Sequence, residues 1–187
     1  MATKILVFAG SARKDSVNKK LAKSAADAVR SSGAEATFID LADYPAPIYD
    51  GDFEAEHGLP QTVRDFKELI ASHDGMLVVT PEYNGSLTPL LVNMFAWASR
   101  AEADGSKGGI MAGKRVALAA ASPGALGGVR VIPRLRDFLA ELGVMAVPGF
   151  VTLPKAFEAF DADGKLTSEH TAKQLEDLAS RLISALK

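Results

Sequence analysis

The chain has 187 residues, of which 48% are hydrophobic, and its formal net charge at neutral pH is −2. This length and composition predict one globular domain spanning residues 1–187. Basic and acidic residues are interspersed and nearly balanced, which argues against binding to nucleic acid or to an anionic membrane surface.

Cysteine is absent from the sequence, so disulfides and thiol redox chemistry are excluded and any redox role needs a bound cofactor. The longest apolar stretches fall short of the ~20 residues that a membrane-spanning helix needs. The start of the chain also lacks a leader cleavage signal. We therefore expect a cytoplasmic protein without membrane insertion. The histidines His57, His73 and His170 are scattered and predict no metal site.

The first half of the chain alternates between strand and helix patterns. Residues 4–9 form a nearly continuous apolar run, as in a strand that is covered on both faces. Residues 18–32 have apolar side chains at helical spacing, and residues 35–41 predict a second strand. A long proline-rich loop follows, until Pro60 opens the next helix.

The second half continues this alternation. Its elements are expected at 75–80 (strand), 87–99 (helix), 114–122 (strand), 129–142 (helix), 144–153 (containing the fifth strand) and 168–186 (helix). Five strands that alternate with helices imply an α/β fold, with a doubly wound parallel sheet and helices on both faces.

Ligands of such sheets bind beyond the carboxyl ends of the strands. The loop after the first strand is GSARKDSVN, residues 10–18. Ser11, Ser16 and Asn18 can donate hydrogen bonds there, and Arg13 can form a charge-assisted pair. Together with the N-terminus of the next helix, these groups suit a terminal phosphate. The same residues fit equally well a turn in which Ser and Asn cap the helix and Arg13 is solvated.

The loop after the third strand is TPEYNGS, residues 80–86. Pro81 fixes one backbone torsion and Gly85 permits unusual ones, so backbone polar groups can face the edge of a planar ring. Tyr83 can add a flat apolar wall. The alternative is a tight turn with Glu82 in solvent.

The loop after the fourth strand is SPGALGG, residues 122–128. Its three glycines allow the backbone to approach a ligand closely, and their N–H groups can stabilise developing negative charge. A flexible connection is the alternative. Taken together, the three loops fit a mononucleotide with a flat head group.

The segments GSARKDSVN, PEYNGSLTPLLVNMFAWAS and SPGALGGVRVIPRLRDFL resemble the NADPH-dependent FMN reductase family of flavodoxin-like proteins, which includes quinone, chromate and azo-compound reductases. The resemblance extends to PAPIYDGDFE and FDADGKLTSEHT and so covers nearly the whole chain. It implies a flavodoxin-like five-stranded sheet that binds FMN.

The resemblance also implies which residues contact FMN. Those expected at the phosphate are Ser11, Arg13, Ser16, Val17 and Asn18. Those expected around the isoalloxazine ring are Pro81, Glu82, Tyr83 and Asn84. Those expected at its pyrimidine side or at the nearby phosphate are Ser122, Gly124, Gly127 and Gly128. No catalytic side chain is implied.

The implied activity is hydride transfer from NADPH or NADH to flavin N5, and then to a quinone, flavin, metal complex or other small electron acceptor. Family members commonly form homodimers and sometimes homotetramers. Pro47, Ile48 and Tyr49 either reach a neighbour's site or pack locally. The chain departs from the family pattern at Val92 and Ala96, where members often carry lysine and aspartate. These two departures concern the substrate pocket or the subunit interface.

Two other functions remain open at this point. A flavodoxin-like one-electron carrier would also bind FMN, but such carriers are usually much more acidic than this chain. A module that binds another phosphorylated ligand is the third possibility. Arg130 and Arg136 are interpreted as surface or interface charges. The segment 159–170 lacks the first and last ligands of a calcium loop and predicts a turn before a capped helix.

Overall fold

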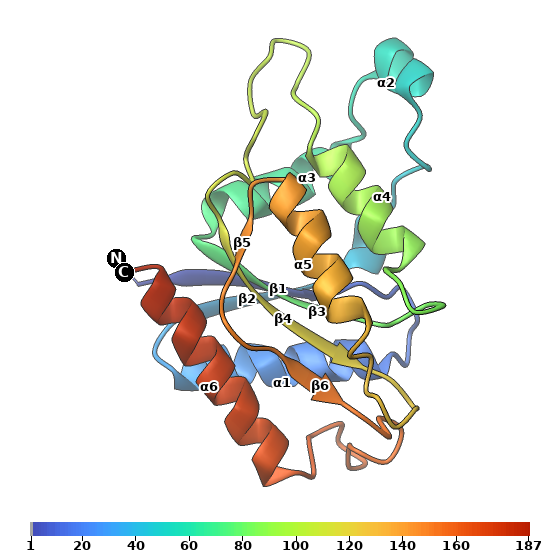
Figure 1. Ribbon diagram of the computed structural model, residues 1–187. Helices are drawn as coiled ribbons and strands as arrows, with labels where there is room; N and C mark the ends of the chain where they lie inside the picture. Colours follow the sequence, from blue (N-terminus) through green and yellow to red (C-terminus); the bar gives the residue numbers. More distant parts are fainter. Residues whose placement is uncertain (1) are drawn as a thin grey trace.

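A parallel sheet forms the centre of the fold, in the order β2-β1-β3-β4, with β5 and β6 both beside β4 (Figure 1). The computed structural model describes residues 2–187. Its strands are β1 (Lys4–Ala9), β2 (Glu35–Asp40), β3 (Gly75–Thr80), β4 (Arg115–Ala121), β5 (Met145–Ala146) and β6 (Val151–Leu153). This is the strand order of flavodoxin-like proteins, so the predicted doubly wound sheet is confirmed.

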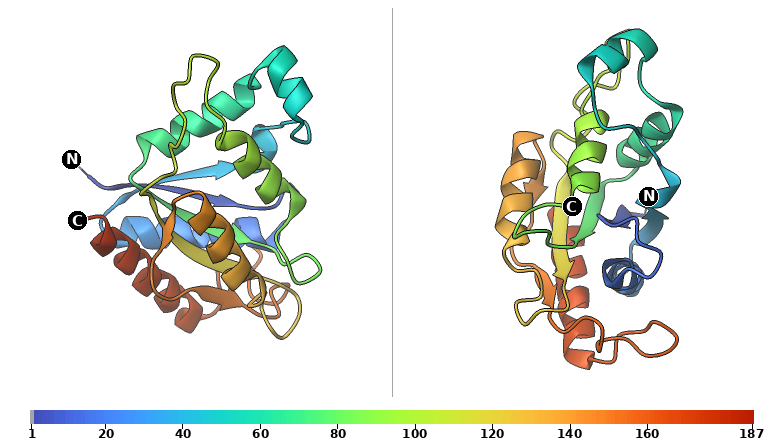
Figure 2. Two further views of the ribbon diagram at one scale, coloured as in Figure 1. Left: turned by 45° about the horizontal axis from the view of Figure 1, so that its top comes forward. Right: turned by 90° about the vertical axis from the view of Figure 1, so that its right-hand side faces the viewer.

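Helices cover both faces of this sheet (Figures 1 and 2). One face carries α1 (Val17–Ser31) and α6 (Glu169–Ala185). The other carries α3 (Gln61–Ser72), α4 (Pro89–Ala98) and α5 (Val131–Glu141). A 3₁₀ turn (Leu41–Asp43) and a short helix, α2 (Gly51–His57), lie between β2 and α3. Within residues 2–187, no helix combines the length and the apolar character needed to cross a bilayer.

Burial on both faces explains why the strands are almost uninterrupted apolar runs. In β1, Ile5 and Val7 pack under α1 and α6, whereas Leu6 and Phe8 pack under the opposite helices. Successive side chains of a strand point to opposite faces, so a strand between two helical layers needs apolar residues at every position.

The long helices α1, α4 and α6 each begin with a hydroxyl side chain that accepts a hydrogen bond from the backbone N–H three residues on. These caps are Ser16 of α1, Thr88 of α4 and Ser168 of α6. Each satisfies one of the N–H groups that a helix start leaves unpaired. The segment before α6 is a turn in which the Asp161 carboxylate accepts two backbone N–H groups, as its sequence predicted.

Two elements differ from the sequence-based expectation. The proline-rich loop contains α2, which starts where the Asp50 carboxylate accepts the N–H groups of Asp52 and Phe53 at 2.8 and 3.3 Å. The single strand expected at 144–153 is split into β5 and β6. Pro148 has no N–H for a ladder bond, and Gly149 has a φ of +84°, so the chain bends between the two pieces.

Candidate functional site

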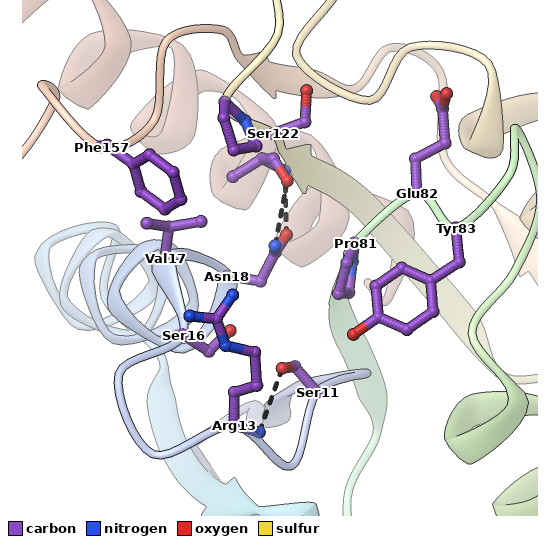
Figure 3. Close-up of a pocket in the computed structure, with 12 residues that line it drawn as sticks. Ser11, Arg13, Ser16, Val17, Asn18, Pro81, Glu82, Tyr83, Ser122 and Phe157 are labelled. Atoms are coloured by element: carbon purple, nitrogen blue, oxygen red, sulfur yellow. Dashed lines mark hydrogen bonds between the residues drawn. The ribbon is translucent and has the colours of Figure 1, made fainter.

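A cleft opens at the carboxyl ends of β1, β3 and β4, between the three loops that follow them (Figure 3). Its empty space, part of which is open solvent, amounts to ≈ 450 Å³. The residues around it are Ser11, Arg13, Ser16, Val17, Asn18, Pro81, Glu82, Tyr83, Ala121, Ser122, Pro123 and Phe157. The structure therefore brings together all the predicted residues of the first loop and most of the second. Asn84, Gly124, Gly127 and Gly128 are outside this lining.

The first loop carries polar groups that suit an anion. The Ser11 hydroxyl accepts the Arg13 N–H, and the Ser16 hydroxyl caps α1 by accepting the Lys19 N–H, each at 3.4 Å. Both hydroxyls keep a proton to donate to a ligand. Among residues 2–187, no carboxylate forms an ion pair with Arg13. This exposed cation lies beside a helix N-terminus, where negative charge is favoured.

Asn18 lines the cleft and also has a structural role. Its side-chain amide donates to the Ala121 carbonyl at 3.0 Å and accepts the Ala121 N–H at 2.9 Å. The buried amide is therefore engaged by the backbone at the end of β4. It fixes the first turn of α1 against the sheet, which positions Ser16 and Arg13.

The second loop is a β-hairpin with a two-residue turn. Tyr83 and Ser86 exchange backbone hydrogen bonds of 3.0 and 2.8 Å. Between them, Asn84 and Gly85 have φ values of +52° and +71°. Asn-Gly is the preferred pair for such a turn because both positions need positive φ. Asn84 forms the tip of the hairpin, whereas Pro81 and the half-exposed Tyr83 ring face the cleft (Figure 3).

The hairpin is held by α5. The largely buried Glu82 carboxylate accepts the Arg130 Nε–H at 2.7 Å and the Arg130 backbone N–H at 3.1 Å. Arg134 of the same helix donates to the Gly85 carbonyl. The tight-turn alternative, which predicted that the Glu82 side chain is in solvent, is therefore wrong on this point. The interpretation of Arg130 as a surface or interface charge missed this contact, because nothing in the sequence pairs residues 82 and 130.

Packing explains two glycines of the third loop. A Cβ on Gly127 would lie 2.8 Å from the Pro154 nitrogen, and one on Gly128 would lie 3.0 Å from the Ala120 Cβ. The loop therefore lies directly on β4 and on the end of β6. The Ser122 N–H donates to the Leu153 carbonyl at 3.1 Å. These glycines thus allow close contact within the protein, and their approach to a ligand stays a prediction.

Sequence reasoning missed Phe157, Pro123 and Ala121, which also line the cleft. Phe157 lies four residues after β6, in the segment PKAFEAF. The only sequence signal there was an aromatic residue in a loop after the last strand, and this signal alone does not separate a packed ring from an exposed one.

The donor set of the cleft fits FMN. Arg13, two hydroxyls and the start of α1 form an anion-binding subsite at one end. Pro81 and Tyr83 offer an apolar surface to a flat ring at the other end (Figure 3).

Comparison with known proteins places these features in a family. A family model described as NADPH-dependent FMN reductase matches residues 3–158. The 2-hydroxy-1,4-benzoquinone reductase of Burkholderia sp is 36% identical over 177 residues, which are 94% of this chain and 92% of that protein. The NAD(P)H:quinone oxidoreductase of Solanum tuberosum is 32% identical over 181 residues, 92% of this chain and 87% of that one.

A solved structure agrees with the sequence relatives. FerB, a flavoenzyme NAD(P)H:(acceptor) oxidoreductase from Paracoccus denitrificans, matches with a TM-score of 0.79 and 29% identity, over 98% of this chain and 97% of that one. The matches confirm the expected flavodoxin-like fold and an oxidoreductase that works with FMN and a nicotinamide donor. The chain belongs to the NADPH-dependent FMN reductase family.

Proposed function

We propose that the protein is an FMN-dependent NAD(P)H:quinone oxidoreductase. The observation that carries this proposal is the cleft, which combines the Arg13 cation, without an ion-pair partner in residues 2–187, at a helix N-terminus with an apolar surface for a flat ring. Relatives named as quinone reductases in Burkholderia sp and Solanum tuberosum support a quinone as the electron acceptor. Chromate, free flavin and other small acceptors are proposed as further substrates.

The residues divide into those that contact FMN and those that position them. Arg13, Ser11, Ser16 and the first N–H groups of α1 hold the phosphate, and Val17 lies beside them. Pro81, Tyr83 and Ser122 border the ring. Bound FMN supplies hydride acceptance and donation at its ring, while the protein supplies binding and orientation.

The remaining predicted residues position those that contact FMN. Asn18 fixes α1, Glu82 fixes the hairpin, and Asn84 makes its turn. Gly127 and Gly128 let the third loop lie against the sheet, and Gly124 accepts the Lys155 N–H that attaches the next segment to it. No side-chain acid or base is assigned, because the proposed residues bind and orient without a proton transfer.

The proposal is tested by acceptor stoichiometry. The FMN-loaded protein is mixed anaerobically with NADPH or NADH and a p-benzoquinone, and both reactants are followed by absorbance. We expect the nucleotide and the quinone to disappear in equal amounts, with no loss when FMN is omitted. A loaded protein that oxidises neither nucleotide contradicts the proposal and favours a one-electron carrier.

We also propose that the single domain, residues 1–187, forms a homodimer or homotetramer in the cytoplasm. Support comes from α4, whose sequence PLLVNMFAWA has no charged residue although Val92 is 38% exposed. A helix that is apolar all round is normally buried. Ile48, at 87%, is the most exposed of the large hydrophobic side chains in residues 2–187. Its loop is attached to α4 by hydrogen bonds from the side chains of Asn93 and Trp97 to the Pro47 carbonyl.

A further inference from the structure

Phe157 is the most exposed aromatic side chain among residues 2–187, at 66%. A Phe ring left in water forgoes the favourable free energy that its burial would provide. Exposed apolar groups at a cleft are typical of surfaces that a ligand covers.

The exposure of Phe157 does not result from a loosely attached loop. The residue before it, Ala156, is fully buried and donates its N–H to the Ser122 carbonyl at 3.1 Å. The Lys155 N–H donates to the Gly124 carbonyl at 3.3 Å, and the Glu158 N–H donates to the Lys155 carbonyl at 2.9 Å. The backbone on both sides of Phe157 is therefore anchored, partly to the loop that lines the cleft.

The ring lies at the anion-binding end of the cleft, where Arg13 is. Figure 3 shows Phe157 next to Val17, in the first turn of α1, on the side where the Arg13 guanidinium lies. Tyr83 and Pro81 form the opposite wall (Figure 3). The cleft thus has two apolar walls, and its unpaired cation lies beside the Phe157 wall.

We infer that Phe157 covers the phosphate end of the bound nucleotide and excludes water from its contact with Arg13. This inference rests on the proposed function, because it requires FMN in this cleft. Water exclusion strengthens a charge pair, since the effective dielectric constant near it falls and dissolved ions screen it less. The contribution of Phe157 should therefore depend on the phosphate charge of the ligand.

Two ligands that differ only in the phosphate test this role. FMN and riboflavin are titrated into flavin-depleted protein, and binding is followed by quenching of flavin fluorescence at low and high salt. The variants are Phe157→Ala, Phe157→Leu and the control Phe150→Ala, which removes a 44% exposed ring that is not part of the cleft. Circular dichroism checks that each variant is folded.

We expect Phe157→Ala to raise the dissociation constant of FMN about tenfold, as expected when a charge-assisted contact is hydrated. The constant for riboflavin should change less than about twofold, which is a small free-energy difference. Salt should weaken FMN binding more in this variant than in the wild type. Phe157→Leu should lie in between, and Phe150→Ala should match the wild type.

Two results overturn the inference while the proposed function stands. In one, wild type and Phe157→Ala bind FMN equally well. In the other, Phe157→Ala weakens FMN and riboflavin by the same factor, which places the ring against the flavin itself. A wild-type protein that binds neither ligand overturns the proposed function, and this inference with it.

Discussion

Arg13 is the residue on which recognition of the phosphate depends most directly. Its guanidinium faces the cleft and is unpaired among residues 2–187. A hydrogen bond to a charged group contributes about 1.5–3 kcal/mol. Arg13→Ala should therefore raise the dissociation constant of FMN roughly 10- to 100-fold and leave that of riboflavin unchanged, as measured by fluorescence quenching.

The matched control for Arg13 is Lys14→Ala, which removes the same charge from the neighbouring exposed residue. Lys14 is not part of the cleft lining, so its loss should change FMN affinity less than about twofold, through long-range electrostatics alone. Equal weakening of FMN by the two variants would mean that net charge, and not the position of Arg13, determines affinity.

Gly127 allows the third loop to lie directly against the end of β6. Gly127→Ala introduces a Cβ 2.8 Å from the Pro154 nitrogen at a φ of +60°, whereas Gly109→Ala has a φ of +66° and no atom within 4 Å. Both changes carry backbone strain of about 1 kcal/mol, and the clash at Gly127 adds about 1–3 kcal/mol. Urea denaturation should show the larger loss of unfolding free energy for Gly127→Ala. Equal losses would show that the contact relaxes without cost.

At the scale of elements, the pair formed by Glu82 and Arg130 attaches the hairpin 80–86 to α5. Arg130→Ala removes the side-chain partner of a largely buried carboxylate. We expect faster amide hydrogen exchange at Tyr83 and Ser86, whose N–H groups close the hairpin. The loss of unfolding free energy should stay below about 1 kcal/mol because the arginine side is mostly exposed.

The control on the same helix is Arg136→Ala. Arg136 is exposed and forms no ion pair within residues 2–187. Its loss should leave exchange at Tyr83 and Ser86 at the wild-type rate. If both variants exchange alike, the contact with Glu82 does not hold the hairpin.

The long helices and strands could be predicted from the sequence because their apolar patterns follow from local backbone geometry and burial. Strands between two helical layers are apolar at each position, and helices such as α1 repeat their apolar residues at helical spacing. The helix α2 was not readable because it buries no residue and therefore has no apolar stripe. The split of the last strand was missed because an apolar run does not reveal where Pro148 and Gly149 interrupt hydrogen bonding.

The candidate site could be predicted from the sequence only where its residues are close together in the chain. The loop with Arg13 and the hairpin with Tyr83 each carry their signal within one short segment. Phe157 and the pair of Glu82 with Arg130 depend on contacts between distant parts of the chain. No periodicity or spacing rule predicts such contacts, so only the three-dimensional structure reveals them.

At the scale of the whole molecule, Ile48 tests the proposed assembly. The side chain is 87% exposed, so Ile48→Glu should change the unfolding free energy by less than about 0.5 kcal/mol. The same change places a charge beside the uncharged helix α4 and should lower the assembly mass in sedimentation. Met145→Glu, at another exposed apolar position, is the control. An unchanged mass in Ile48→Glu would remove this surface from the interface.

In the proposed function, one domain binds FMN at the carboxyl edge of its sheet and reduces it with a nicotinamide donor. The most direct test is an anaerobic visible spectrum of the purified protein, taken after FMN is added and free flavin removed, and again after NADPH. We expect a retained flavin band that NADPH bleaches rapidly, and that Arg13→Ala loses during removal of free flavin. A retained band that neither NADPH nor NADH bleaches, or no retained band in the wild type, would contradict it.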